Sequence, residues 1–306
     1  MAHSPIITLI TPVFNAAATI EKTFQSVQAQ TYPYIDYIVV DGGSTDGTVE
    51  IIERYRGIIR YFHSRPDRGP YDAVNQALAL AQGEITGIVS ADDWLAPDAV
   101  ETVAALAEAD KEAEIFCFAL EEQRQTANGA LRPARIFCDP EGERFRLFDG
   151  IYCQGLSRFY RTELMRRAGL FDGARYPKLA DREWYMRVGL REPRKTRTPK
   201  TLYYFRCHPG SISGGGKMGG TVRSLQEMAQ IARHYLREKP LSPLQREWVK
   251  NWYCFTMVRL VFYAARDGKL SEALRAFTET LRRYPARFAL RVAAYKLPRG
   301  YRHRIP

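Results

Sequence analysis

The sequence predicts an α/β fold in which helices cover both faces of a mostly parallel sheet. Apolar runs of strand length alternate with helical patterns over the first 120 residues, and the runs are continuously apolar, as in strands that are buried on both faces. After about residue 220 the pattern is helical throughout. We therefore expect an α/β domain over residues 1–210, followed by a Gly-rich loop, a helical region and a basic tail over residues 211–306.

Local patterns place the individual elements. Strands are expected at residues 6–10, 37–40, 58–62, 85–89 and 114–120. Helices are expected near residues 20–27, 48–55, 71–81, 97–108, 162–168 and 180–190, and in the later region at 221–238, 242–265 and 271–284. Pro97, followed by the acids Asp98 and Glu101, favours a helix start. Ser242 and Gln245 have the spacing of a capping box.

Composition and charge narrow the function classes. The chain has 306 residues, of which 45% are hydrophobic and 12% aromatic, so it can bury a sizeable core. Its net charge is +11, but residues 281–306 hold eight Lys or Arg and no acid, which leaves +3 for the rest. This distribution argues against a protein that binds nucleic acid along its whole surface.

Cysteine usage and hydropathy indicate a cytoplasmic protein. The five cysteines are odd in number and scattered, without a CxxC pair, so a disulfide framework or a zinc site is not expected. The apolar run near the N-terminus is too short for a signal peptide. Residues 252–265 form the most apolar late stretch, but it is shorter than a membrane span and contains Arg259.

Acidic residues follow three expected elements. DGGSTDG occupies residues 41–47, SADDW residues 90–94 and ADREW residues 180–184. Because ligands of parallel sheets bind beyond the carboxyl ends of the strands, the first two clusters mark a candidate site. Paired carboxylates repel one another unless a cation or strong hydrogen-bond donors lie between them, and all-oxygen ligands suit Mg²⁺ or Mn²⁺. Helix capping and turn formation are alternative roles for the same aspartates.

An ordered set of motifs carries a family resemblance. TPVFN lies at residues 11–15, DGGSTDG at 41–47, DRGPYDAVN at 67–75, GE at 83–84 and SADDW at 90–94. Together they resemble the family 2 inverting nucleotide-sugar glycosyltransferases, which have the GT-A fold. The resemblance covers roughly residues 5–210 and is most specific in the first 100.

The resemblance implies roles for individual residues. The nucleotide-binding positions that it indicates are Pro12, Phe14, Asn15, Asp41, Asp67 and Asp92. Among these, Pro12 and Phe14 match the start of the nucleotide pocket, and Asp41 matches an aspartate that accepts from the base, usually uracil. Asp92 matches a ribose contact, and Asp93 matches the carboxylate that ligates Mn²⁺ or Mg²⁺ under the diphosphate. Asp72 is an additional site residue without an assigned role.

The same resemblance places the catalytic base and a lid. Asp181 matches the general base, with Glu183 as the alternative. The base assists direct attack by the acceptor hydroxyl, so that no covalent sugar–enzyme intermediate forms. Arg206, His208 and Lys217 are candidates for the diphosphate, and the loop 208–220 resembles a segment that folds over it.

The expected activity is transfer of a sugar from a nucleotide-sugar donor, with UDP as the expected nucleotide, to a glycan or lipid-linked acceptor in polysaccharide or glycolipid biosynthesis. A sugar-nucleotide pyrophosphorylase is an alternative, but it should carry a Gly-rich loop with Arg and Lys after the first strand. A non-catalytic transferase-like scaffold is another. The basic tail is expected either to contact the inner face of an anionic membrane as a peripheral anchor or to dock on the protein itself.

Overall fold

The computed structural model describes residues 4–137, 157–208, 221–287 and 289–290. The chain divides into two compact units, of which the first comprises Met1–Leu147 and Tyr152–Gly216, and the second Phe148–Ile151 and Lys217–Pro306. Each unit is described by itself.

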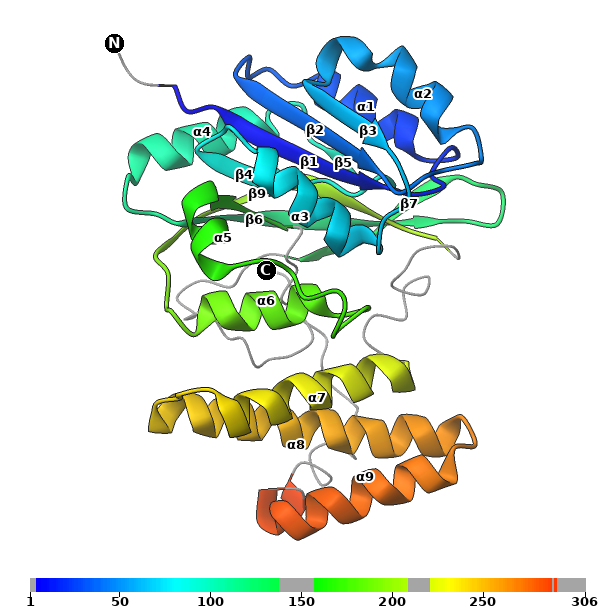
Figure 1. Cartoon of the computed structure of the whole chain (residues 1–306), viewed down its shortest axis with the longest axis vertical. Coiled ribbons are helices and arrows are strands. Elements are labelled where there is room, and N and C mark those ends of the chain that lie inside the picture. Colours follow the sequence, from blue (N-terminus) through cyan, green and yellow to red (C-terminus); the bar gives the residue numbers. More distant parts are fainter. Residues whose placement is uncertain (1–3, 138–156, 209–220, 288, 291–306) are drawn as a thin grey trace. The chain divides into compact units, whose positions relative to one another are not determined.

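A nine-stranded mixed sheet forms the centre of the first unit (Figure 1). Its strands are β1 (Ile7–Val13), β2 (Ile35–Asp41), β3 (Tyr61–Ser64), β4 (Ile85–Ile88), β5 (Trp94–Leu95), β6 (Ile115–Gln125), β7 (Leu131–Phe137), β8 (Arg158–Arg161) and β9 (Lys195–Cys207). The order is β3-β2-β1-β4-β8-β6-β9-β5, and β7 pairs with β6. The first four strands are mutually parallel, whereas β8 runs antiparallel between β4 and β6.

Helices cover both faces of the sheet, as predicted. They are α1 (Ile20–Gln28), α2 (Thr48–Arg54), α3 (Pro70–Leu80), α4 (Ala99–Ala109), α5 (Thr162–Ala168) and α6 (Ala180–Gly189). The strand order reverses direction between β3 and β4, and right-handed crossovers therefore place α1 and α2 on one face and α3 on the other (Figure 1). Residues of β1 and β2, with Phe24 of α1, are completely buried in the core.

Several boundaries differ from the prediction: β1 ends at Val13 rather than at residue 10, and β6 continues to Gln125 rather than ending at residue 120. We expected the third strand at 58–62, but a 3-10 turn, η1 (Arg56–Ile58), occupies its start and β3 begins at Tyr61. The apolar Ile58 and Ile59 mimic a strand in sequence, although they close the turn after α2. The helix expected at 97–108 begins at Ala99, with Asp98 as its N-cap residue.

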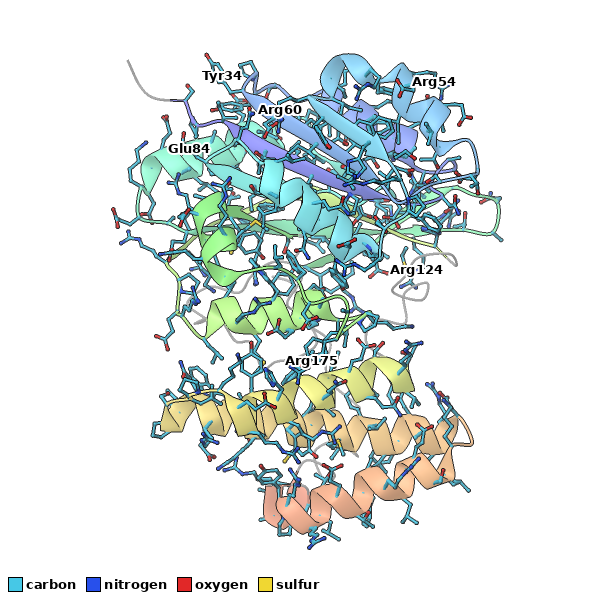
Figure 2. The ribbon with its side chains drawn as sticks, in the orientation of Figure 1. Tyr34, Arg54, Arg60, Glu84, Arg124 and Arg175 are labelled. Carbon is cyan, nitrogen blue, oxygen red and sulfur yellow. The ribbon has the colours of Figure 1, made fainter. Side chains whose placement is uncertain are left out.

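A buried carboxylate fixes the start of β2 against its neighbours. Asp36 accepts hydrogen bonds from the Thr8 hydroxyl at 2.7 Å and from the Gln82 amide at 2.9 Å, and it pairs with Arg60. Arg60 is labelled in Figure 2, at the edge of the sheet. Although burial raises the pKa of Asp36, hydrogen bonds from Arg60, Gln82 and Thr8 outweigh it, and the net pKa lies below its ordinary value.

The described residues of the second unit include the helices α7 (Val222–Glu238), α8 (Pro243–Arg266) and α9 (Leu270–Arg283). The predicted capping box at the start of α8 is present, because the Ser242 hydroxyl accepts from the Gln245 amide at 3.2 Å and the Gln245 side chain accepts from the Ser242 amide at 3.1 Å. Across the described ranges, the structure contains no helix with the length and apolarity needed to span a membrane.

Candidate nucleotide and catalytic site

The carboxyl ends of the parallel strands gather the predicted nucleotide residues at one edge of the sheet. Val13 at the end of β1 is in register with Asp41 at the end of β2, and Asp41 is in register with Ser64 at the end of β3. The segment with Asp92 and Asp93 follows β4, which also pairs with β1. Chain segments far apart in the sequence therefore meet here because the strands are parallel and adjacent.

Asp41 is fully buried and organises the loop that follows β2. Its Oδ2 accepts hydrogen bonds from the amides of Gly43 and Ser44, at 3.0 and 2.8 Å, and from the Ser64 hydroxyl at 2.6 Å. Its Oδ1 accepts from the Ser44 hydroxyl. The predicted contact between Asp41 and a nucleotide base therefore requires one of these donors to move away. Alternatively, Oδ1, which accepts only one of these hydrogen bonds, could accept a second one from the base.

The loop after β1 is tied to the same structure. The Asn15 amide donates to the Ser44 hydroxyl oxygen at 2.7 Å, and the Asn15 side chain accepts from the Thr45 amide at 2.9 Å. Asn15 has a φ of +46°, a conformation that asparagine tolerates better than most residues. Beside it, the Phe14 ring is 65% exposed. The loop thus presents an aromatic side chain next to a hydrogen-bonded turn, and Pro12, near the end of β1, is half-buried.

The loop after β3 brings Asp67 to this edge. A Cβ atom placed on Gly42 would lie 3.0 Å from Asp67 Oδ1, so the two loops approach closely. Burial raises the pKa of Asp67, and the nearby Asp72 and Asp41 raise it further. Asp72 lies in the first turn of α3, and its carboxylate forms an ion pair with Arg68 at 2.9 Å.

Asp92 and Asp93 have opposite environments. Asp93 is fully buried, and its two oxygens accept from the Tyr203 hydroxyl at 2.7 Å and from the Arg206 amide at 2.8 Å. Burial, with Asp92 next to it, raises the pKa of Asp93 well above its ordinary value. The Asp92 side chain is 24% exposed and lies 3.2 Å from Nε2 of His208.

Asp93, the predicted metal ligand, is engaged by the protein at both of its oxygens. Asp92 and Asp93 both lie in the turn after β4, and Asp93 is the one that is buried, with each of its oxygens accepting from a protein donor. The partly exposed Asp92 pairs instead with His208, 116 residues later in the chain. Among the residues that the structure describes, no three His, Cys, Asp or Glu side chains cluster as a metal site.

A cationic cluster lies beside the aspartates. Arg206 is 7% exposed, and within the described part of the chain its Nε has no hydrogen-bond partner. Its guanidinium lies 5.6 Å from the centre of the Trp94 ring, and Nζ of Lys22 lies 3.4 Å from the same ring. Burial and the charge of Arg206 lower the pKa of Lys22. The sequence analysis missed Lys22, because a lysine on α1 carries no motif.

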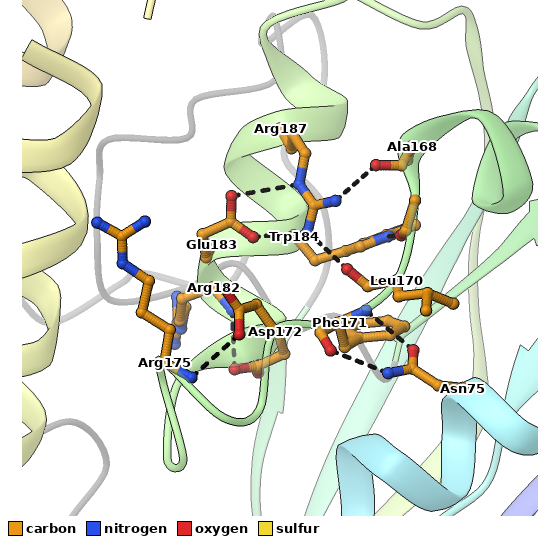
Figure 3. Close-up of polar contacts among 12 residues, drawn as sticks. Asn75, Ala168, Leu170, Phe171, Asp172, Arg175, Arg182, Glu183, Trp184 and Arg187 are labelled. Atoms are coloured by element: carbon orange, nitrogen blue, oxygen red, sulfur yellow. Dashed lines mark hydrogen bonds and ion pairs between the residues drawn. The ribbon is translucent and has the colours of Figure 1, made fainter. Parts of the chain in front are cut away.

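Asp181 lies in the first turn of α6 and is half-buried. Its Oδ1 accepts from the Tyr71 hydroxyl at 3.0 Å and from the Arg182 amide at 2.8 Å. The alternative, Glu183, has a different environment: its side chain is 7% exposed and pairs with Arg187 at 2.6 Å (Figure 3). Both oxygens of Glu183 therefore accept from Arg187, whereas Oδ2 of Asp181 has no hydrogen-bond partner among the described residues.

The remaining predicted residues are only partly described. Lys217 and the expected lid beyond His208 lie outside the described residues, as does most of the basic tail. Tyr71, like Lys22, was not predicted from the sequence. It stands within the DRGPYDAVN motif at residues 67–75, but a tyrosine there has no chemical signal until the fold brings α6 against α3.

Comparison with known proteins agrees with this architecture. A curated relative, the putative teichuronic acid biosynthesis glycosyltransferase TuaG of Bacillus subtilis, is 37% identical over 100 residues, which is 32% of this chain and 40% of TuaG. The chain spans less than half the length of TuaG and of two Mycobacterium tuberculosis relatives.

Solved structures show the fold. TarS of Staphylococcus aureus, residues 1–349 with UDP-GlcNAc, aligns with a TM-score of 0.68 at 20% identity, over 94% of this chain and 83% of that one. The mannosyltransferase PcManGT of Pyrobaculum calidifontis, with GDP-Man and Mn²⁺, aligns with a TM-score of 0.59 at 20% identity, over 96% and 80%. The predicted GT-A fold is thereby confirmed.

The family model for glycosyl transferase family 2 matches residues 8–192, which include β1 to β8, the acidic strand ends and Asp181. The chain belongs to glycosyl transferase family 2.

Proposed function

We propose that this chain transfers a sugar from a nucleoside diphosphate donor, with UDP as the expected nucleotide, to a hydroxyl group of a glycan or lipid-linked acceptor, with inversion at the anomeric carbon. The observation that carries the proposal is the pairing of a rigid nucleotide edge, built on Asn15, Asp41 and Asp67, with a carboxylate, Asp181, that keeps one oxygen without a described partner. The UDP-GlcNAc bound by TarS supports the choice of donor.

The residues of this chain have separable roles in the proposed reaction. Phe14 offers a ring face for the base, Arg206 supplies positive charge beside Asp92, and Lys22 adds a second cation at the same Trp94 ring. Asp181 takes the proton of the acceptor hydroxyl while the oxygen of that hydroxyl attacks the anomeric carbon of the donor sugar. The bond from that carbon to the phosphate oxygen breaks, and its electron pair leaves with the nucleoside diphosphate.

We propose Asp92 and His208 as the protein ligands of a divalent cation, in place of the predicted Asp93. A partly exposed carboxylate and an imidazole nitrogen 3.2 Å apart fit a site that water and phosphate oxygens complete. The Mn²⁺ complex of PcManGT supports Mn²⁺ as the first ion to test. When bound, such a cation neutralises the charge that develops on the leaving diphosphate.

A thermal-shift panel tests donor and metal together. UDP, GDP, CDP and dTDP are added with Mn²⁺ or with EDTA; a ligand at 100 times its Kd stabilises the folded state by about 2.7 kcal/mol. We expect UDP to give the largest shift and EDTA to reduce it. Asp92→Asn should remove the Mn²⁺-dependent part. If Asp92→Asn retains that part and Asp93→Asn loses it, the original assignment to Asp93 is restored.

We further propose that the second unit contacts an anionic membrane. On α9, Leu270, Leu274 and Leu281 share one face and are 70%, 63% and 42% exposed. Arg275 and Arg282 lie on the same helix, and the basic tail follows. We expect Leu270→Glu with Leu274→Glu to reduce flotation with anionic liposomes. Equal flotation of this variant and the parent chain would remove the membrane role.

A further inference from the structure

Tyr71 occupies a rigid position between α3 and α6. It lies in the first turn of α3, and its ring stacks on Phe171 with centroids 6.0 Å apart and planes inclined by 15°. Phe171 in turn stacks on the buried Trp184 of α6, at 5.0 Å and 21°. The Asn75 side chain holds the backbone of Phe171 through two hydrogen bonds of 2.9 Å (Figure 3). The Tyr71 ring therefore has little freedom to move.

The hydroxyl of Tyr71 is directed at the proposed base. It lies 3.0 Å from Oδ1 of Asp181 and 3.1 Å from the carbonyl oxygen of Lys178. Burial and the charge of Asp181 raise the pKa of Tyr71 well above its ordinary value, so the hydroxyl keeps its proton and acts as a donor. The Arg182 amide donates to the same Oδ1 at 2.8 Å.

Both donors thus act on one oxygen of the carboxylate. Oδ2 of Asp181 accepts no hydrogen bond from any described residue. Two donors at Oδ1 fix the rotation of the carboxylate about its Cβ–Cγ bond, which leaves the direction of Oδ2 fixed as well. A carboxylate held in this way loses less orientational freedom when it meets an acceptor hydroxyl.

We propose that Tyr71 is a positioning residue that ties Oδ1 of Asp181 and thereby makes Oδ2 the atom that receives the acceptor proton. This inference rests on the proposed role of Asp181 as the base. In the step itself the acceptor O–H bond breaks, the proton passes to Oδ2, and the acceptor oxygen forms the new bond to the anomeric carbon. Tyr71 keeps its own proton throughout.

The kinetic test uses Tyr71→Phe, which keeps the stacked ring and removes only the hydroxyl. UDP release from UDP-GlcNAc with Mn²⁺ is measured, with water as the acceptor probe. A hydrogen bond to a charged group corresponds to roughly tenfold or more in rate. We expect kcat to fall by about this factor while the KM for donor stays unchanged and the variant remains folded at the assay temperature. A rise in KM with unchanged kcat would overturn the positioning role.

Tyr32→Phe is the matched control. The Tyr32 hydroxyl also donates to a backbone carbonyl, that of Pro5, at 2.8 Å, but it lies at the opposite end of the sheet from the acidic strand ends. This variant should keep both kcat and KM. Equal losses in the two Tyr→Phe variants would mean that the effect is general and would overturn the proposal.

A double-mutant cycle with Asp181→Ala separates this inference from the proposed function. Because Lys178 still accepts from Tyr71, Asp181→Ala does not leave the buried hydroxyl without an acceptor. If Tyr71 acts through Asp181, Tyr71→Phe has no further effect on UDP release in the Asp181→Ala background. A full additional loss would overturn the positioning role. If Asp181→Ala alone leaves the rate unchanged, the base assignment fails instead.

The same four proteins give a measurement that needs no turnover. Changes in the free energy of unfolding on Tyr71→Phe and Asp181→Ala should be non-additive, because the two side chains share one hydrogen bond. Additive changes would show that the contact between Tyr71 and Asp181 does not form in solution. The proposal would then be wrong, whatever rates of UDP release the four proteins show.

Discussion

Asp41 allows the strongest test of how the nucleotide edge is built. Asp41→Asn keeps one oxygen, which can take the place of Oδ2 and retain its donors from Gly43, Ser44 and Ser64. The new amide then faces the Ser44 hydroxyl, which can turn its proton away and accept. One hydrogen bond is exchanged and a buried charge is removed, so the expected cost is within about 1 kcal/mol.

Asp41→Ala has a larger effect because all four donors lose their acceptor. Two of them are backbone amides that cannot turn toward another partner without moving the loop. An unsatisfied buried donor costs about 1–3 kcal/mol, and the loop is half-buried, so about 2–4 kcal/mol is expected in total. For a unit of this size that corresponds to a fall in melting temperature of roughly 5–15 °C.

Chemical denaturation followed by circular dichroism measures the difference between the two variants. We expect Asp41→Ala to be clearly less stable than Asp41→Asn. Equal stabilities would refute the view that hydrogen-bond acceptance by Asp41 holds the loop. UDP binding by Asp41→Asn gives a separate result: unchanged affinity would contradict the predicted contact of Asp41 with the base, whereas weaker affinity in a stable variant would support it.

Three further outcomes are expected. Gly87→Ala should strongly destabilise the protein, because a Cβ atom there would lie 2.3 Å from the buried ring of Phe159; thermal unfolding checks this, and an unchanged melting temperature would contradict it. Asp36 has a lowered pKa in the folded state, so its stabilisation through Arg60 should be complete at neutral pH and decline as the pH falls below about 4; the stability difference between wild type and Asp36→Asn should narrow over that range. Glu183→Gln should lower the melting temperature because it weakens the ion pair with Arg187, while donor turnover per folded molecule stays the same. Loss of turnover in a folded variant would instead indicate that Glu183 is the catalytic base.

The sequence alone predicted the fold class, the approximate positions of the first strands and the family. Continuous apolar runs separated by helical patterns are a local property, so β1, β2, β4 and the helices between them could be recognised without tertiary information. The acidic motifs follow those strands directly, and parallel strands bring their carboxyl ends to one edge whatever the details of packing. The start of β3 was misplaced, because two isoleucines of a turn have the composition of a strand.

Only the tertiary structure distinguishes the environments of the side chains within each motif. Asp92 and Asp93 are adjacent in sequence and chemically identical, yet Tyr203 and Arg206 of β9 bury one of them while His208 lies beside the other. The distinction arises from contacts that span more than 100 residues, which no local pattern encodes. The same holds for Tyr71 and Asp181, because a hydroxyl acquires its role from the carboxylate that the packing of α6 places 3.0 Å away.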